Sequence, residues 1–188
     1  IYPPETRIDT HLLHGSAQAN PDGFGFLIYA AEGETLHMPE TPAGTRSSGR
    51  THIIASYTEF ETALRHFENI RALNPGCTGV FHARKATLGP KNLDNVHPYR
   101  THDGQWVFHN GKFDGYGDET TCDTVDWLTR HTNQPGWIER FTQDLGTGRA
   151  VVFDPETTTI TPLGFEAGHH IAGVIYSNTS YTGIPDPV

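Results

Sequence analysis

The stretch GVFHARKATLGPKNLDNVHPY, residues 79–99, begins like a buried strand and turns polar within a few positions. The apolar residues 79–81 are followed closely by His82, Arg84 and Thr87. A strand that packs into a core has little use for an arginine followed so soon by a threonine. Polar groups at a strand end are where a scaffold presents functional side chains. We therefore interpret this stretch as a strand that leads into a functional loop.

Two other stretches also place polar residues beside apolar ones: NPDGFGF at 20–26 and WVFHNG at 106–111. Several strand candidates are apolar at consecutive positions, which suits strands that are covered on both faces. The predicted strands span residues 23–30, 52–56, 78–84, 106–109, 149–153, 158–163 and 173–177.

Four segments have the apolar spacing of helices. The strongest is 58–73, where Thr58 and Glu61 predict a capping box at the start. The Pro/Gly/Ser-rich segment 39–49 is predicted to be a surface loop. Strands with a few helices that do not strictly alternate indicate an α+β or layered-sheet architecture. The other predicted helices span residues 10–19, 121–131 and 137–145.

Composition narrows the class of protein and of partner. The chain has 188 residues, 35% of them apolar, and a net charge of −9; this predicts one globular domain over residues 1–188. An acidic balance disfavours nucleic acid or an anionic membrane as the main partner. No apolar run reaches the ~20 residues of a membrane span. Cys77 and Cys122 form no CxxC pair and fit a reduced cytoplasmic protein, with a single bridge left open.

Each candidate residue has a structural interpretation beside its functional one. Arg84 can hold a carboxylate through two parallel hydrogen bonds, helped by the Thr87 hydroxyl, or it can pair with an acid of the protein. Asn110 and the Gly111 N–H can form an oxyanion hole, or they can form a hairpin turn. Asp123 can bind a ligand or cap the helix that follows it.

The histidines and glycines favour neither a metal nor a cofactor. The 12 histidines include no HExxH motif and no Cys/His zinc spacing. The GFGF segment at 23–26 lacks the spacing of a dinucleotide fingerprint. We therefore predict a protein without a metal or cofactor.

Taken in order, the polar segments resemble the glutaminase domain of class II glutamine amidotransferases, in the N-terminal-nucleophile hydrolase superfamily. Leu88 departs from the pattern, because many members carry histidine there, and the tail GVIYSNTSY at 173–181 resembles the closing strand of small members. The family patterns N-D-G-x-G, H-x-R-x-A-T-x-G, N-x-H-P-[FY], H-N-G and S-D-[ST] correspond to residues 20–25, 82–89, 95–99, 109–111 and 122–124.

The resemblance implies a four-layered αββα fold, with two stacked antiparallel sheets between helices. It also implies that Arg84 and Thr87 hold the α-carboxylate of glutamine and that Asp123 binds its α-amino group. Asn110 and the Gly111 N–H match the oxyanion hole of the family. A zwitterion needs one cationic and one anionic contact, and this set of residues supplies both.

The family's nucleophile is a cysteine at the mature N-terminus, whose own α-amine serves as the base. The printed sequence begins IYPP, and Ile1 has no nucleophilic atom. Because IYPP resembles the end of the first strand of small members, we expect the cysteine just before Ile1. The alternative is a pseudoenzyme that binds without cleaving. Cys77 and Cys122 are poor substitutes because neither carries a terminal amine.

The resemblance therefore predicts an amidohydrolase that releases ammonia from glutamine through a γ-glutamyl thioester. His82 is expected to support the substrate site without an assigned chemical step. The chain is short for an added synthase domain, so we expect a separate ammonia-accepting subunit. The alternatives are a γ-glutamyl amide hydrolase acting on another small molecule and a binding or regulatory module. Specificity is expected to depend on the loops at 39–49 and 90–94.

Overall fold

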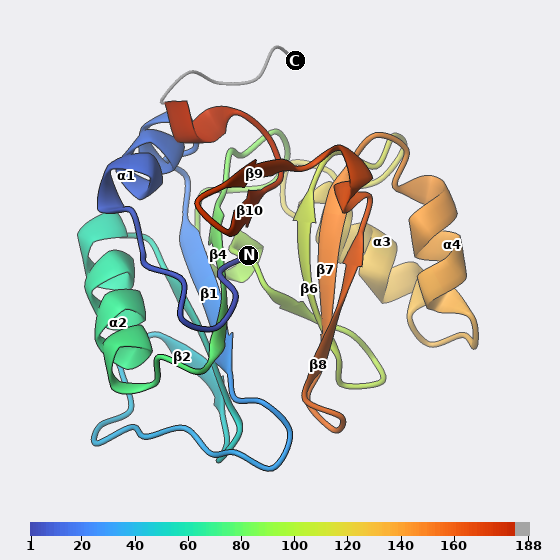
Figure 1. Cartoon of the computed structure of the whole chain (residues 1–188). Helices are drawn as coiled ribbons and strands as arrows, with labels where there is room; N and C mark the ends of the chain where they lie inside the picture. The colour runs from blue at the N-terminus through green and yellow to red at the C-terminus, as the bar shows by residue number, and fades with distance from the viewer. Residues whose placement is uncertain (183–188) are drawn as a thin grey trace.

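The computed structural model describes residues 1–182 and stacks two antiparallel four-stranded sheets face to face, with helices on both outer sides (Figure 1). The first sheet has the order β2-β3-β1-β4 and is covered by α1 and α2. These elements are α1 (Thr10–Ala19), β1 (Phe24–Tyr29), β2 (Thr45–Ser48), β3 (His52–Tyr57), α2 (Phe60–Leu73) and β4 (Thr78–Ala83).

The second sheet has the order β5-β6-β7-β8 and is covered by α3 and α4. A small two-stranded sheet of β9 and β10 lies beside the two large ones. These elements are β5 (Tyr99–Arg100), β6 (Trp106–Asn110), α3 (Asp123–His131), α4 (Trp137–Asp144), β7 (Arg149–Asp154), β8 (Thr159–Leu163), β9 (His169–Ile171) and β10 (Val174–Tyr176). Short 3-10 helices span Leu93–Asn95, Phe165–Ala167 and Ser180–Thr182.

The layers explain why whole strands are apolar. Successive side chains of a strand point to opposite faces, and both faces are buried here. Phe26 packs beneath the helices of the first sheet, whereas its neighbour Leu27 packs between the sheets. On β7, Val152 packs beneath α3 and α4, and Phe153 packs between the sheets. The predicted α+β fold with stacked antiparallel sheets between helices is confirmed.

The capping box predicted at the start of α2 is wrong. The helix begins at Phe60, and its N-cap residue, Glu59, makes no side-chain capping hydrogen bond. Strand β3 continues to Tyr57, so Thr58 lies in the connection instead of at the cap. Glu61 remains an acid in the first turn, where it complements the helix dipole.

The segment 39–49, predicted to be a loop, contains the edge strand β2. Its sequence TRSS carries no apolar alternation, and it becomes a strand because it pairs with β3 across a bulge. The short strands β5 and β9 were also not predicted, since two or three residues are too few to show an alternation of apolar and polar side chains.

The first two residues pair with β4 and with β10. Tyr2 exchanges both backbone hydrogen bonds with Gly79 of β4, at 2.7 and 2.8 Å. Ile1 does the same with Ile175 of β10, at 2.6 and 2.9 Å. Such an exchange is the mark of an antiparallel pair, so this end of the chain is fixed in register. Among the described residues, no helix is long and apolar enough to cross a membrane.

Candidate functional site

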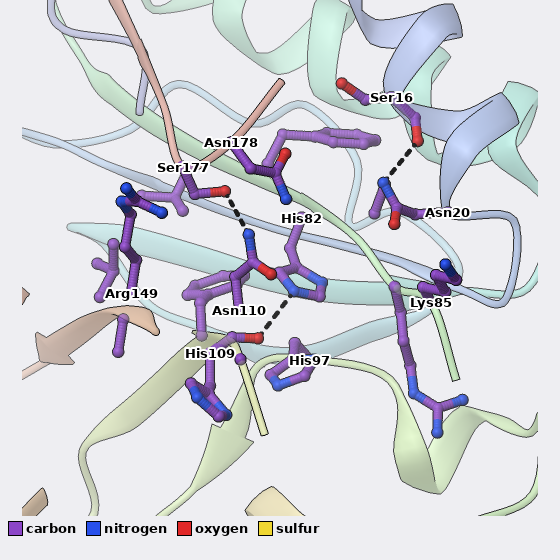
Figure 2. Close-up of a pocket in the computed structure, with 18 of the residues that line it drawn as sticks. Ser16, Asn20, His82, Lys85, His97, His109, Asn110, Arg149, Ser177 and Asn178 are labelled. Atoms are coloured by element: carbon purple, nitrogen blue, oxygen red, sulfur yellow. Dashed lines mark hydrogen bonds between the residues drawn. The ribbon is translucent and has the colours of Figure 1, made fainter. Parts of the chain in front are cut away.

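One pocket brings together all the residues that the sequence predicts for the site. It is lined by the ends of β4, β6 and β10, the start of α3, and Ile1. Figure 2 shows Asn110 near its centre, with His82 beside it. The motifs lie far apart in the sequence and meet here because β4 and β6 belong to the two stacked sheets. The predicted residues that line the pocket are His82, Arg84, Thr87, Asn110, Gly111 and Asp123.

Arg84 is buried, with 4% of its surface exposed, directly after β4. Its guanidinium donates to the carbonyl oxygens of Leu88, at 2.9 Å, and Pro90, at 3.4 Å. Asp22 holds the same loop by accepting from the Ala86 N–H at 2.9 Å. Within residues 1–182, no acid forms an ion pair with Arg84. The close ion pair that the structural alternative requires is therefore absent from residues 1–182, although the carboxylate of Asp22 lies near enough to interact with the charge of Arg84.

Asp123 supplies a carboxylate to the same pocket. It is the first residue of α3 and is buried, and its Oδ2 accepts from the Phe113 N–H at 2.7 Å. Burial raises the pKa of this carboxyl group, although the hydrogen bond from Phe113 opposes the rise. The N-cap position belongs to Cys122, so Asp123 is the first residue of the helix and does not occupy the N-cap position that the structural alternative assigned to it. A carboxylate here also faces the favourable end of the helix dipole.

Asn110 ends β6 and points its amide into the pocket (Figure 2). The amide nitrogen donates to the Ser177 hydroxyl at 2.8 Å, which leaves one of its two N–H groups for a ligand. The chain then runs from Gly111 through α3 and α4 before returning as β7, so the predicted hairpin turn is wrong. A Cβ at Gly111 would come within 2.6 Å of His109 Nε2, so a residue with a side chain would clash at this position.

The buried His97 and His109 and the half-buried His82 lie at the base of the pocket. His82 Nε2 donates to the His109 carbonyl at 3.1 Å and so links β4 to β6; its ring centroid lies 4.2 Å from that of His97. Burial lowers the pKa of His82 to about 4 and that of His109 to about 3. These side chains are therefore neutral at pH 7. No group of three or more His, Cys, Asp or Glu side chains in the described chain could hold a metal ion.

These histidines predict acid sensitivity of the fold. Because the folded-state pKa values of His97 and His109 lie below the ordinary 6.5, the unfolded chain binds protons first. The free energy of unfolding is then at its full value above about pH 6.5. It falls as the pH drops toward the folded-state pKa values, by up to ~1.4 kcal/mol per pH unit for each histidine. Urea unfolding at about pH 7 and about pH 5 measures this.

In His109→Gln, the free energy of unfolding is expected to fall less between the two pH values, because one of the titrating histidines has been removed. In the control His11→Gln, which changes an exposed residue of α1, the decrease is expected to equal that of the unmodified protein. Equal stability of the unmodified protein at the two pH values would contradict the assignment of neutral buried histidines.

The pocket also contains residues that the sequence analysis missed. Lys85 and Lys112 directly follow predicted residues, and this adjacency could have revealed them. Ser177 and Arg149 lie in the C-terminal part, within predicted strands, and no functional role was predicted for either of them. Figure 2 shows Lys85 and Arg149 on opposite sides of Asn110. The pocket thus has basic groups toward both ends and an amide between them.

Comparisons with known proteins found a matching family and a curated relative. The model of the family described as "Glutamine amidotransferases class-II" matches residues 10–126. A curated protein of Haemophilus influenzae, named "Putative glutamine amidotransferase", is 31% identical over 109 residues, which is 56% of this chain and 31% of the relative. The chain thus matches about a third of the length of that relative.

Proposed function

We propose that this chain, which belongs to the class II glutamine amidotransferase family, hydrolyses the side-chain amide of glutamine or of a γ-glutamyl compound. The observation that carries the proposal is the pocket itself. It holds the buried Arg84, which forms no close ion pair within residues 1–182, the buried carboxylate of Asp123 and, farther along, the Asn110 amide. A glutamine zwitterion presents a carboxylate and an ammonium at one end and an amide at the other, so each group has a matching partner.

In this proposal, Arg84 and Thr87 bind the α-carboxylate, and Asp123 binds the α-ammonium. Charge-assisted hydrogen bonds of this kind are about twice as strong as neutral ones. Both ions lose their water in the pocket, so each needs its partner. The remaining N–H of Asn110 and the N–H of Gly111 then face the side-chain carbonyl, where the oxyanion develops.

The proposed nucleophile is the thiol of a cysteine before Ile1. The pairing of Ile1 with Ile175 supports this, because a preceding residue would continue along β10 toward Ser177, the partner of Asn110. Its amine takes the thiol proton while sulfur attacks the amide carbon. The C–N bond then breaks, the nitrogen takes that proton, and water hydrolyses the thioester to glutamate. With glutamine, ammonia leaves, and a separate synthase subunit would consume it.

Ser177 is proposed as a positioning residue, because its hydroxyl fixes the Asn110 amide. We expect Ser177→Ala to lower kcat about fivefold and to leave KM nearly unchanged, since a lost hydrogen bond of ~1 kcal/mol lets the amide rotate. Ser177→Thr keeps the hydroxyl and is expected to restore most of kcat. Steady-state kinetics of glutamate release measures both variants. An unchanged kcat in Ser177→Ala would remove this role.

The proposal as a whole is tested by the full-length protein with its natural N-terminus. Glutamate release from L-glutamine, together with calorimetric binding of glutamine, separates the two main outcomes. Release together with binding supports a hydrolase. Binding without release favours the pseudoenzyme alternative, and the absence of both overturns the proposed function.

A further inference from the structure

The acidic residue of the segment NPDGFGF, Asp22, has no part in the proposed reaction, yet it lies directly behind one part of the substrate pocket. It does not line the pocket, and its side chain is only 9% exposed. Its backbone N–H donates to the Arg84 carbonyl at 2.9 Å, and the Arg84 N–H donates to the Gly23 carbonyl at 2.8 Å. This exchange continues the pairing of β1 with β4, so Asp22 is fixed in register beside Arg84.

The Asp22 carboxylate holds both ends of the loop that carries the proposed carboxylate clamp, residues 84–91. Near the start of the loop, Oδ2 accepts from the Ala86 N–H at 2.9 Å, and at its end Oδ1 pairs with Lys91 Nζ at 2.6 Å. Arg84 and Thr87 line the pocket, whereas Ala86 and Lys91 do not. Asp22 therefore contacts the loop from outside the pocket, while the side chains proposed to bind substrate line its inside.

Arg84 depends on the conformation of this loop. Its guanidinium donates to the carbonyls of Leu88 and Pro90, within the same loop. A guanidinium has five N–H donors, so others remain for a substrate. Their direction follows from the loop, and an arginine binds a carboxylate with a fixed, planar geometry. A loop that shifts would therefore misalign the clamp even though Arg84 itself is retained.

Lys91 also balances the negative charge behind the clamp. The Asp22 carboxylate lies near enough to interact with the charge of Arg84, but its close ion pair within residues 1–182 is with Lys91. Burial raises the pKa of the Asp22 carboxyl, whereas the hydrogen bonds from Lys91 and the Ala86 N–H bring it below its ordinary value, so the group is ionised at pH 7. Without Lys91, this charge would compete more strongly with a substrate carboxylate for Arg84.

We propose that Asp22 is a positioning residue, which aligns Arg84 and Thr87 with the α-carboxylate of a glutamyl substrate. It does so by holding the loop at Ala86 and at Lys91. The inference rests on the proposed function and adds to it a residue that contacts neither the substrate nor the reacting atoms. Loss of Asp22 is therefore expected to weaken substrate binding and to leave the chemical step nearly unchanged.

Steady-state kinetics and calorimetric titration with L-glutamine, on the full-length protein with its natural N-terminus, test this inference. We expect Asp22→Ala to raise KM and the dissociation constant about tenfold, the scale of one hydrogen bond to a charged group, and to change kcat less than about twofold. Asp22→Asn keeps an oxygen for the Ala86 N–H and loses the ion pair, so an intermediate effect is expected. Lys91→Gln is expected to raise KM only about threefold, because Lys91 is 67% exposed and water screens its charge.

Two further variants separate positioning from a general loss of stability. Asp154→Ala is the matched control, because Asp154 also accepts from the backbone N–H groups of a turn, but outside the pocket. It is expected to leave KM and kcat unchanged. A double-mutant cycle on kcat/KM then identifies the residue through which Asp22 acts. In an Arg84→Gln background, Asp22→Ala is expected to lower kcat/KM less than about threefold, because the clamp is already lost.

The failures of the two proposals are distinguishable. If the unmodified protein binds glutamine and a folded Asp22→Ala binds it equally well, the inference is overturned and the proposed function stands. Should Asp22→Ala not fold, Asp22→Asn decides in the same way, and the exposed Lys91→Gln decides if neither folds. A full tenfold effect of Asp22→Ala in the Arg84→Gln background would also overturn the inference. If the unmodified protein neither binds nor cleaves glutamine, the proposed function fails, and the inference fails with it.

Discussion

Replacing Asn110 with alanine is expected to lower kcat for glutamate release several hundred-fold, with little change in the affinity for glutamine. The amide is proposed to donate to the oxyanion, which forms only after the nucleophile attacks. Losing one such donor costs about 3 kcal/mol of transition-state stabilisation in hydrolases. Because the amino-acid end of the substrate binds elsewhere in the pocket, binding is preserved. Single-turnover kinetics together with calorimetry measures the two quantities separately.

Asn133→Ala is the matched control for this prediction, because Asn133 is an exposed asparagine outside the pocket. We expect it to retain the full kcat. If Asn110→Ala retained a similar kcat, the oxyanion hole would have to be sought elsewhere.

Replacing Arg84 with glutamine is expected to weaken glutamine binding by about 100-fold or more, because truncating one partner of a buried charge pair costs roughly 2–5 kcal/mol. Arg84→Lys keeps the charge but loses the planar fork, so an intermediate affinity is expected. Calorimetric titration with glutamine measures all three proteins. Thermal unfolding of each protein is measured as well, because Arg84 also donates to the carbonyls of its own loop and a loss of binding has to be distinguished from a loss of folding.

Arg65→Gln, at an exposed position on α2, provides the matched control for the loss of one positive charge. Its affinity for glutamine is expected to equal that of the unmodified protein. Should a folded Arg84→Gln bind glutamine within about threefold of the unmodified protein, the carboxylate clamp would be wrong.

The layered architecture could be predicted from the sequence because its strongest strands are apolar at consecutive positions. Such a strand has to be covered on both faces, and β1 and β7 are covered in this way. The edge strand β2 could not be predicted, because its sequence TRSS contains no apolar residues whose alternation would indicate a strand. Its conformation depends on pairing with β3, a contact between segments and not a property of either one alone.

The residues of the candidate site also differ in whether the sequence predicts them. Residues within motifs, such as Arg84 and Asn110, could be predicted because neighbouring residues gave each one a context. Ser177 could not, since its contact with Asn110 spans 67 positions and depends on β10.

This pocket is proposed, above all, to hold a glutamyl substrate for attack by a cysteine before Ile1. The most direct test treats the full-length protein, with its natural N-terminus, with the glutamine-mimicking electrophile 6-diazo-5-oxo-L-norleucine and maps the adduct by peptide mass spectrometry. We expect one adduct, on the cysteine preceding Ile1, and its suppression by excess glutamine. An adduct on Cys77 or Cys122, or no adduct at all, would contradict it.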